Sequence, residues 1–371
     1  MTMTTSTDPT LDGETVEQFS TRLFTAVLGA QEIQAVYLGD RLGWYRALAA
    51  QGPLSSAELA TSTATTERYA REWLEQQAAA GYLIVDDVDA AVERRRFRLP
   101  AGPAEVLTDD DSLNYLAPLA RFVAGLGKHL DALSNAYCSG GGVSWTQLGE
   151  DAREAQGALN RPLLLHQLGS EILPAIPDLD AVLRRGARVA DIGCGLGWSS
   201  IGIARSYPAS TVDGFDIDEP SIVRARRNAA DAGVADRTTF TTVDAGHRPT
   251  TDHPAGRYDA VFAFECIHDL PDPVAVLSAM RSLTRPHGQV IIMDENVGDR
   301  FAGPASEVER MFYGFSLTCC LPDSMSQTPS TATGTVMRAS TLADYAYRAG
   351  FRRTEVLPVQ HDFFRFYRLH H

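Results

Sequence analysis

The feature that most constrains the fold of this chain is a glycine-rich turn between an apolar segment and a segment with helical character. Residues 189–197 read Val-Ala-Asp-Ile-Gly-Cys-Gly-Leu-Gly, and Trp198 begins the helical segment. Glycines suit a turn where the backbone bends tightly and a ligand lies against it. The following helix would direct its free N–H groups at that ligand. The pattern therefore predicts a strand, a ligand-binding turn and a helix in succession.

The residues around this turn separate two classes of nucleotide cofactor. The dinucleotide-binding fingerprint has a third glycine where this chain has Trp198. The apolar strand carries Asp191 just before the turn instead. Both differences disfavour a dinucleotide.

Strands and helices alternate from residue 187 onward. Most of the predicted strands are separated by helical segments, which implies a mainly parallel sheet covered on both faces. The link 358–362 is too short for a parallel crossover, so the last two strands should form an antiparallel hairpin at the sheet edge. The predicted strands are 188–192, 211–216, 238–243, 258–264, 289–293, 353–357 and 363–369.

Acidic residues stand at the ends of successive strands. Ligands of open parallel sheets bind at the carboxyl ends of the strands. Asp216 ends the second strand and could accept both hydroxyls of a ribose; Asp244 and Ala245 follow the third and could meet an adenine. A single Asp in such a place often only caps the next helix. Three in order, counting Asp191, favour a cofactor site.

The N-terminal half has a different pattern. Residues 1–15 are polar and predicted to be a disordered tail, and 16–105 show helix, short helix, long helix and a polar hairpin, the pattern of a winged helix. Residues 106–185 are predicted as a helical connector, in which Pro162 starts a helix because its missing N–H costs nothing there. Residues 186–371, which contain the alternating strands and helices, are predicted to form the last domain.

These segments together resemble class I S-adenosylmethionine (SAM) methyltransferases, over roughly residues 186–371. The whole chain resembles an actinobacterial group of such enzymes with an N-terminal winged-helix domain, through the segments 160–162, 265–269 and 364–369. The resemblance implies an α/β, Rossmann-like seven-stranded sheet that binds SAM and releases S-adenosyl-L-homocysteine. The cofactor-binding residues it implies are Asp191, Gly193, Gly195, Gly197, Asp216, Ile217, Asp244, Ala245 and Phe264.

His268 is the candidate general base. A hydroxyl acceptor benefits from a base with a near-neutral pKa, and His268 follows the fourth strand, beside the expected methyl group. The segment 267–269 resembles the His-Asp segment of plant-type small-molecule O-methyltransferases, in which two acids flank the histidine. Asp294 could be one of them. The position expected for the second, at 336–338, has no acid. A structural or helix-capping role for His268 is the alternative.

Two further hypotheses concern the surroundings of His268. A metal site made of His268, Asp269, Asp294 and Glu295 is conceivable, but no ligand-spacing motif supports it, and no metal is predicted. The segment 312–338 is predicted to cover the substrate, with a mobile part at 322–334 rich in Ser, Thr and Pro. The expected substrate contacts are Phe312, Tyr313, Phe315 and Met337.

Charge and composition restrict the partners. The 371 residues carry a formal net charge of −14, which argues against nucleic acid or an anionic membrane as the main partner. Residues 30–100 contain eight Arg against ten Asp or Glu, so DNA binding by the winged helix is disfavoured and a homodimer through this domain is expected. Five cysteines without paired spacing, no apolar run of membrane length and no signal pattern predict a cytoplasmic protein.

The sequence thus predicts methyl transfer from SAM to a small, aromatic or otherwise apolar metabolite, at oxygen and with His268 as base. Three alternatives remain open. The acceptor atom could be nitrogen or carbon, with no base needed. SAM could serve a non-methylating reaction such as a cyclisation or decarboxylation. The chain could also be a SAM-responsive regulator, which would require a basic recognition face that the winged helix lacks.

Overall fold

The computed structural model describes residues 13–246 and 256–371. The chain divides into two compact units. One contains the N-terminal part up to Lys128 together with Glu154–Pro162, and the other contains His129–Arg153 and Leu163–His371. The predicted connector 106–185 is therefore divided between the two units. No helix within the described residues is both long and apolar enough to span a membrane.

The first unit is helical, with a small two-stranded wing. Thr15 caps the first helix through a capping box with Gln18. The predicted tail 1–15 therefore extends too far at its C-terminal end. Residues 1–12 of this tail lie outside the described part of the chain. Ser55 and Glu58 form a second capping box at the start of the short helix. The elements are α1 (Val16–Arg41), α2 (Trp44–Gln51), α3 (Ser56–Thr63), α4 (Glu67–Ala79), β1 (Ile84–Val85), η2 (Val92–Arg94), β2 (Phe97–Arg98), α5 (Ala101–Thr108) and α6 (Ala117–Gly127).

The core of the first unit is built around aromatic side chains. Trp44 and Trp73 are almost fully buried, and their ring centroids lie 4.8 Å apart. The indole N–H of Trp73 donates to the carbonyl oxygen of Ala35, 2.9 Å away, so the buried polar group is satisfied. The wing strands pair antiparallel through Ile84 with Arg98 and Val85 with Phe97. The winged-helix prediction is confirmed.

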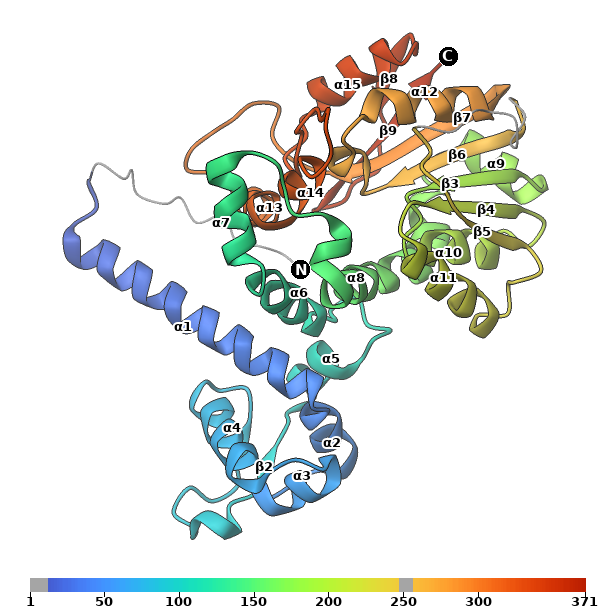
Figure 1. Ribbon diagram of the computed structural model, residues 1–371. Coiled ribbons are helices and arrows are strands. Elements are labelled where there is room, and N and C mark those ends of the chain that lie inside the picture. The colour runs from blue at the N-terminus through green and yellow to red at the C-terminus, as the bar shows by residue number, and fades with distance from the viewer. Residues whose placement is uncertain (1–12, 247–255) are drawn as a thin grey trace. The chain divides into compact units, whose positions relative to one another are not determined.

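The second unit contains a seven-stranded sheet of order β5-β4-β3-β6-β7-β9-β8 (Figure 1). The pairs among β5, β4, β3, β6 and β7 are parallel, whereas β9 pairs antiparallel with both β7 and β8. The predicted sheet and its reversed hairpin are thus confirmed. The strands are β3 (Arg188–Ile192), β4 (Thr211–Asp216), β5 (Thr238–Thr242), β6 (Tyr258–Phe264), β7 (Thr284–Glu295), β8 (Arg353–Val356) and β9 (Phe364–His370).

Helices cover both faces of this sheet, as Figure 1 shows. Successive strand residues alternate between two core clusters: Val189 packs in one with Ile201 and Ile222, and Ala190 in the other with Leu277. The helical elements of the unit are α7 (Leu130–Ser139), η3 (Leu163–Ile172), α9 (Pro177–Arg185), α10 (Trp198–Ser206), α11 (Glu219–Asp231), η4 (Ile267–Asp269), α12 (Pro273–Leu283), α13 (Glu307–Phe315), η5 (Ser316–Cys320), α14 (Leu321–Ser324) and α15 (Ala339–Arg348).

The prediction that Pro162 starts a helix is wrong. Helix α8 (Trp145–Pro162) ends with this proline, and the π-helical segment η3 continues directly from it. A proline inside a helix removes one hydrogen bond and crowds the preceding turn. The wider π-helical turn accommodates that irregularity, so the chain remains helical through the proline.

Candidate active site

The glycine turn follows β3 and leaves bare backbone at the strand ends. Gly193 has a φ of +69°, and a Cβ there would lie 2.7 Å from the sulfur of Cys266. Gly195 has a φ of +50°, and a Cβ there would meet no atom within 4 Å. Gly197, with a φ of +82°, is the N-cap of α10. Only glycine adopts this succession of positive φ angles easily, and the space beside Gly195 leaves its backbone accessible to a ligand.

Asp191 holds the start of α10. Its side chain is fully buried, and Oδ2 accepts hydrogen bonds from the hydroxyls of Ser199 and Ser200, each at 2.6 Å. Burial raises the pKa of Asp191 to about 6, although both serines act in the opposite direction. Its Oδ1 is buried with no hydrogen-bond partner among the described residues. The predicted position of Asp191 behind the turn is therefore the one observed.

Asp216 ends β4 directly beside the glycine turn. Its Oδ2 accepts from the N–H of Gly195 and its Oδ1 from the N–H of Asp218, both at 2.8 Å. Burial raises the pKa of Asp216. The next residue, Ile217, is 59% exposed although it is apolar, which makes it available to the face of a ring. The strand end thus combines a carboxylate and an uncovered apolar side chain.

The other predicted cofactor residues lie at neighbouring strand ends. Asp244 and Ala245 follow β5; the N–H of Gly246 donates to Asp244 at 2.9 Å, and Ala245 packs against the second core cluster. Phe264 ends β6, is 8% exposed and stacks on Phe262 with centroids 5.2 Å apart.

These residues fit a cofactor that contains a nucleoside. The fit depends on three features: the open space beside Gly195, the carboxylate of Asp216 at the end of β4, and the exposed Ile217, which lies between β4 and α11. A ribose diol needs an acceptor and an adenine needs apolar contact, and both are present at one edge of the sheet.

His268 lies in η4 at the end of β6 and is surrounded by carboxylates. Its Nδ1 is 2.8 Å from Asp294 and 2.9 Å from Glu295, and its Nε2 is 3.1 Å from Asp269. The side chains of His268, Asp294 and Glu295 are at most 3% exposed. The structure therefore brings His268 and Asp294 together as predicted. The second flanking acid is Glu295, the residue after Asp294, rather than a residue at 336–338.

The carboxylates hold His268 in its protonated form. Burial alone would lower its pKa, but Asp269, Glu295 and Asp294 together raise the pKa of His268 well above its usual range. Burial raises the pKa of Glu295 well above its usual range, whereas His268 and backbone and side-chain hydrogen bonds bring the pKa of Asp294 below its own. An imidazolium cannot accept a proton, so His268 can act as a base only after it loses one.

The same cluster contains groups that could ligate a metal ion. Ligand atoms of His268, Asp294 and Glu295 lie within 4.8 Å of one another, as do those of His268, Asp269 and Cys320. The proton on His268 supplies positive charge to the cluster without a metal. The prediction that no metal binds here stays a prediction.

Sequence reasoning missed two features of this edge. Glu265, between Phe264 and the His268 turn, has a φ of +54°, a backbone conformation rare for non-glycine residues and typical of functional turns. The sequence suggests Glu295 only as a possible metal ligand. The two adjacent acids at 294–295 are the signal that a second carboxylate could reach His268. Arg153, described below, carried no signal because it lies far from the strand ends in sequence.

Backbone hydrogen bonds connect the predicted substrate segment to the turn that carries His268. Thr331 donates to the carbonyl oxygen of Pro271 at 2.8 Å and Gly334 to that of His268 at 3.2 Å, so this segment lies along the histidine turn. Phe312 is 5% exposed, and Tyr313 accepts a hydrogen bond from Arg338 at 3.1 Å. The partly exposed Phe315 ends α13, and Met337 packs in the second core cluster. A mobile loop at 322–334 stays a prediction.

Two segments of the chain match families of known proteins. Residues 183–338 match the family described as a methyltransferase domain. Residues 33–109 match the family described as an Rv2258c-like winged HTH domain. The two matched segments overlap the predicted α/β segment 186–371 and the predicted winged-helix segment 16–105.

Proteins of known function are similar to part of the chain. The 27-O-demethylrifamycin SV methyltransferase of Amycolatopsis mediterranei (strain S699) is 34% identical over 129 residues, which are 35% of this chain and 46% of that protein. A ubiquinone biosynthesis O-methyltransferase of Aeromonas salmonicida (strain A449) is 35% identical over 132 residues, 36% of this chain and 52% of that protein. The chain thus spans about half the length of the curated relatives it matches.

Solved structures are similar over nearly the whole chain. The mitomycin 7-O-methyltransferase has a TM-score of 0.70 and 21% identity, over 95% of this chain and 98% of that one. Human N-acetylserotonin methyltransferase, solved in complex with SAM, has a TM-score of 0.68 and 18% identity, over 96% of this chain and 99% of that one. At this level of identity, the likeness supports the fold.

Proposed function

Because the chain belongs to the methyltransferases with an N-terminal winged helix-turn-helix domain, we propose that it transfers a methyl group from SAM to the oxygen of a small apolar or aromatic molecule. The observation that carries this proposal is the edge of the sheet where a cofactor turn and a buried histidine with carboxylate partners occur together. The glycine turn and Asp216 end β3 and β4, and His268 follows β6, which pairs with β3.

The cofactor is held by the β3 and β4 ends in this proposal. When bound, SAM supplies a methyl group on a positively charged sulfur. Asp216 accepts hydrogen bonds from the ribose hydroxyls, Ile217 contacts the adenine, and the bare backbone at Gly195 allows close approach. Asp244 and Ala245 lie at the next strand end on the adenine side. Much of the rate acceleration would come from holding the acceptor in line with the methyl group.

His268 would remove the proton of the acceptor hydroxyl. Asp294 orients the ring through Nδ1, so Nε2 is the nitrogen that would face the acceptor, and the acceptor hydroxyl would replace Asp269 as its partner. The acid–base cycle needs the neutral imidazole before transfer and yields the imidazolium afterwards. The carboxylates that raise the pKa of His268 also stabilise this imidazolium product.

The acceptor is expected to be apolar or aromatic. Phe312, Tyr313 and Phe315 lie on one helix, α13, and the following segment contacts the His268 turn through Gly334. Apolar walls with a few oriented polar groups are typical of small-molecule sites. The proposal is supported by this composition, and the identity of the acceptor is left to experiment.

Incubation of the purified protein with SAM and a panel of phenols, hydroxyquinones and amines tests the proposal. Mass spectrometry should find a product in which one hydrogen is replaced by a methyl group, with S-adenosyl-L-homocysteine released in equal amount. Turnover of SAM without a methylated product would favour a non-methylating reaction. If calorimetry found no binding of S-adenosyl-L-homocysteine, the proposed function would fail.

One observation favours a second mechanism on the same cofactor. Both ring nitrogens of His268 already face carboxylates, and the ring is protonated at neutral pH. Methyl transfer to an acceptor that needs no base, such as a neutral amine or an ionised phenol, would leave this cluster intact. Loss of activity on substituting His268 separates the two mechanisms, as described in the Discussion.

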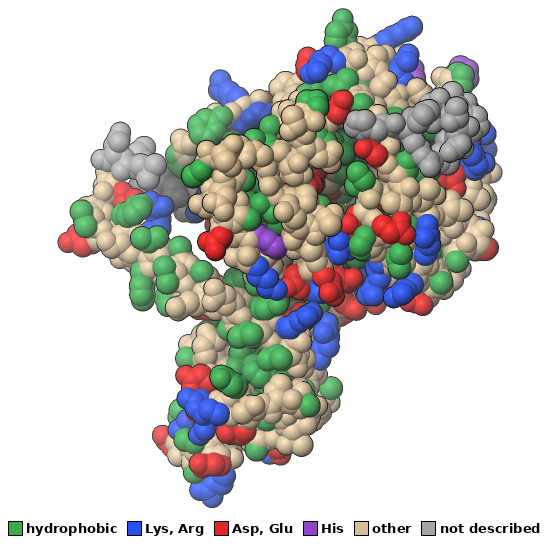
Figure 2. Space-filling model, in the orientation of Figure 1, with side chains coloured by type: hydrophobic (Ala, Val, Ile, Leu, Met, Phe, Trp, Pro, Cys, Tyr) green, Lys and Arg blue, Asp and Glu red, His purple; other side chains and the backbone are tan. Residues whose placement is uncertain are grey.

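We also propose a homodimer through the first unit. The N-terminal half of α1 exposes an apolar stripe at helical spacing, which Figure 2 shows as hydrophobic side chains along this helix; its members are Val16, Phe19, Leu23, Phe24, Val27 and Leu28, 42–83% exposed. The identical stripe of a second copy is the natural cover. Light scattering should find a dimer that Phe24→Glu converts to monomer. A monomeric parent protein would contradict the proposal.

All five cysteines are free, which fits a reducing compartment such as the cytoplasm.

A further inference from the structure

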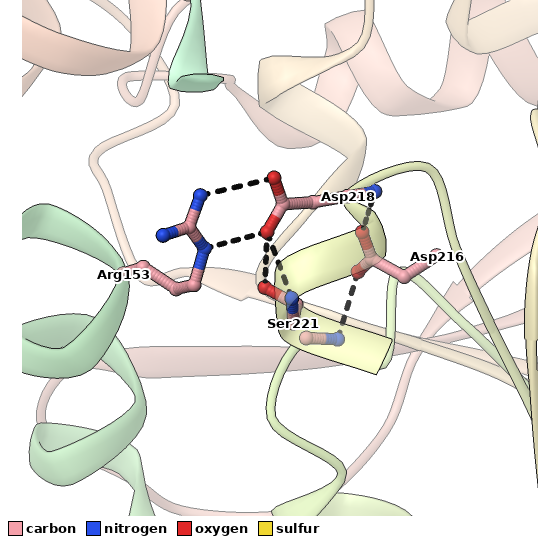
Figure 3. Close-up of polar contacts among 5 residues, drawn as sticks. Arg153, Asp216, Asp218 and Ser221 are labelled. Atoms are coloured by element: carbon pink, nitrogen blue, oxygen red, sulfur yellow. Dashed lines mark hydrogen bonds and ion pairs between the residues drawn. The ribbon is translucent and has the colours of Figure 1, made fainter. Parts of the chain in front are cut away.

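A buried ion pair joins a distant segment to the cofactor edge of the sheet. Arg153 donates two hydrogen bonds to Asp218, from Nε to Oδ2 at 2.6 Å and from Nη2 to Oδ1 at 3.1 Å (Figure 3). The two side chains are only 11% and 4% exposed. Burial alone would raise the pKa of Asp218, but hydrogen bonds from Arg153 and Ser221 bring it below its usual range. Asp218 is therefore an anion that depends on Arg153 for its charge compensation.

Asp218 in turn positions the cofactor carboxylate. Its side chain caps α11 by accepting from the N–H and hydroxyl of Ser221, at 3.0 and 2.6 Å. Its own N–H donates to Asp216, whose other oxygen accepts from Gly195, as Figure 3 shows. A continuous hydrogen-bonded path therefore runs from Arg153 through Asp218 and Asp216 to the glycine turn.

The segment that carries Arg153, residues 142–153, is fastened at its other end to the predicted substrate segment. The N–H of Val143 donates to the carbonyl oxygen of Pro322 at 3.0 Å, and the N–H of Trp145 donates to Asp323 Oδ1 at 2.7 Å. A Cβ at Gly142 would collide with the backbone at Pro322, so the approach requires glycine. Segment 142–153 thus joins α14 to the turn between β4 and α11.

We propose that Arg153 is a positioning residue for the cofactor: by compensating Asp218 it keeps the turn 216–218 in the conformation in which Asp216 can accept from the ribose. It does not touch the cofactor itself. Segment 142–153 contacts α14 at one end and Asp218 at the other, and both contacts need the segment in its present conformation. Packing of the segment against Asp218 and binding of the cofactor at Asp216 therefore stabilise each other. Such coupling is reciprocal by linkage. The inference relies on the proposed SAM site.

Calorimetry with S-adenosyl-L-homocysteine tests the coupling in the full chain. Arg153→Met, which keeps the length and removes the charge, should weaken binding on the order of tenfold or more. Arg153→Lys keeps a point charge but loses the paired geometry, so its affinity should lie between those of Arg153→Met and the parent protein. In kinetics with SAM, KM should rise while kcat at saturation changes little. Arg348→Met, in an exposed pair with Asp344 on the same unit, is the matched control and should bind like the parent.

Hydrogen exchange provides a readout that a merely structural role would not change. Addition of S-adenosyl-L-homocysteine to the parent protein should protect peptides within 142–153, and Arg153→Met should lose that protection. If Arg153→Met does not fold, Arg153→Lys carries the test. Affinity equal to the parent in both Arg153 variants, or no ligand-dependent protection in the parent, would overturn the proposal. A parent protein that does not bind the ligand at all would overturn the proposed function instead.

Discussion

The two halves of the candidate site hold their carboxylates in opposite ways. At the ends of β3 and β4, Asp191 and Asp216 accept hydrogen bonds from hydroxyl and backbone N–H groups, none of which titrates in the physiological range. At the ends of β6 and β7, the carboxylates instead surround His268, which does titrate. The first half should keep its geometry across neutral pH, whereas the second should change its charge.

This difference matches what each half must do in the proposed reaction. A cofactor that binds at every turnover needs hydrogen-bond acceptors that stay in place. Neutral hydroxyl and N–H donors hold the carboxylates in place without changing their own protonation state. An acceptor hydroxyl must lose a proton, which needs a group that can change its charge near neutral pH. Each prediction below breaks one half and asks whether the other is affected.

The largest effect on cofactor affinity is expected at Asp216. Asp216→Ala removes the acceptor of the Gly195 and Asp218 N–H groups as well as that of the ribose. Each hydrogen bond to a charged group contributes about 1.5–3 kcal/mol, so affinity for S-adenosyl-L-homocysteine should fall by about two orders of magnitude or more. Asp216→Asn, which retains one oxygen, should lose less. Calorimetry is the measurement, and unchanged affinity in Asp216→Ala would remove the cofactor site from this edge.

Substitution of His268 should affect only the second half. His268→Ala should lower kcat on a hydroxyl acceptor by about 10²–10⁴-fold, the usual contribution of a general base. Its affinity for S-adenosyl-L-homocysteine should stay within about twofold, because no contact at the β3 and β4 ends is changed. Stopped assays at saturating SAM and calorimetry on the same preparation give both values. Near-normal turnover would favour the mechanism without a base.

The pH dependence of kcat should follow the protonation of His268. Its pKa is raised well above the usual range, so the neutral imidazole that accepts a proton is scarce at neutral pH and increases as the pH rises. kcat should therefore increase as the pH rises above neutrality. An ionising acceptor could produce a similar rise, so the comparison is with His268→Ala, in which the rise should disappear. The same rise in both proteins would assign it to the acceptor.

Both halves should lose stability as the pH rises, but in different pH ranges. For His268 the folded pKa exceeds the unfolded one, so its stabilisation is fully present below the unfolded pKa and is lost as the pH rises through the folded value. For Asp191 burial raises the pKa from about 3.9 to about 6, so its protonated form also favours folding, and stability is lost as the pH rises between these two values. The serines beside Asp191 reduce that loss.

Much of this arrangement could be predicted from the sequence, because it follows from strand ends in a parallel sheet. The order of Asp191, Asp216 and His268 along successive strands is local information, and the topology brings such ends to one edge. The second acid beside His268 was not identified from the sequence, because β7 ends in two acids and only the structure shows that both reach one ring. Arg153 could not be predicted, since its partner Asp218 is 65 residues away and the ion pair depends on how segment 142–153 packs.

The smallest effect is expected at the serines that hold Asp191. Ser200→Ala removes one hydrogen bond to a buried, partly ionised carboxylate, which should lower the free energy of unfolding by about 1.5 kcal/mol at alkaline pH. The loss should shrink below about pH 6, where Asp191 becomes protonated and the hydroxyl contributes less. Urea unfolding at about pH 5 and about pH 8 measures both values, with the exposed Ser139→Ala as control. A loss that grew toward acid would contradict the assignment of the Ser200 hydrogen bond to the ionised form of Asp191.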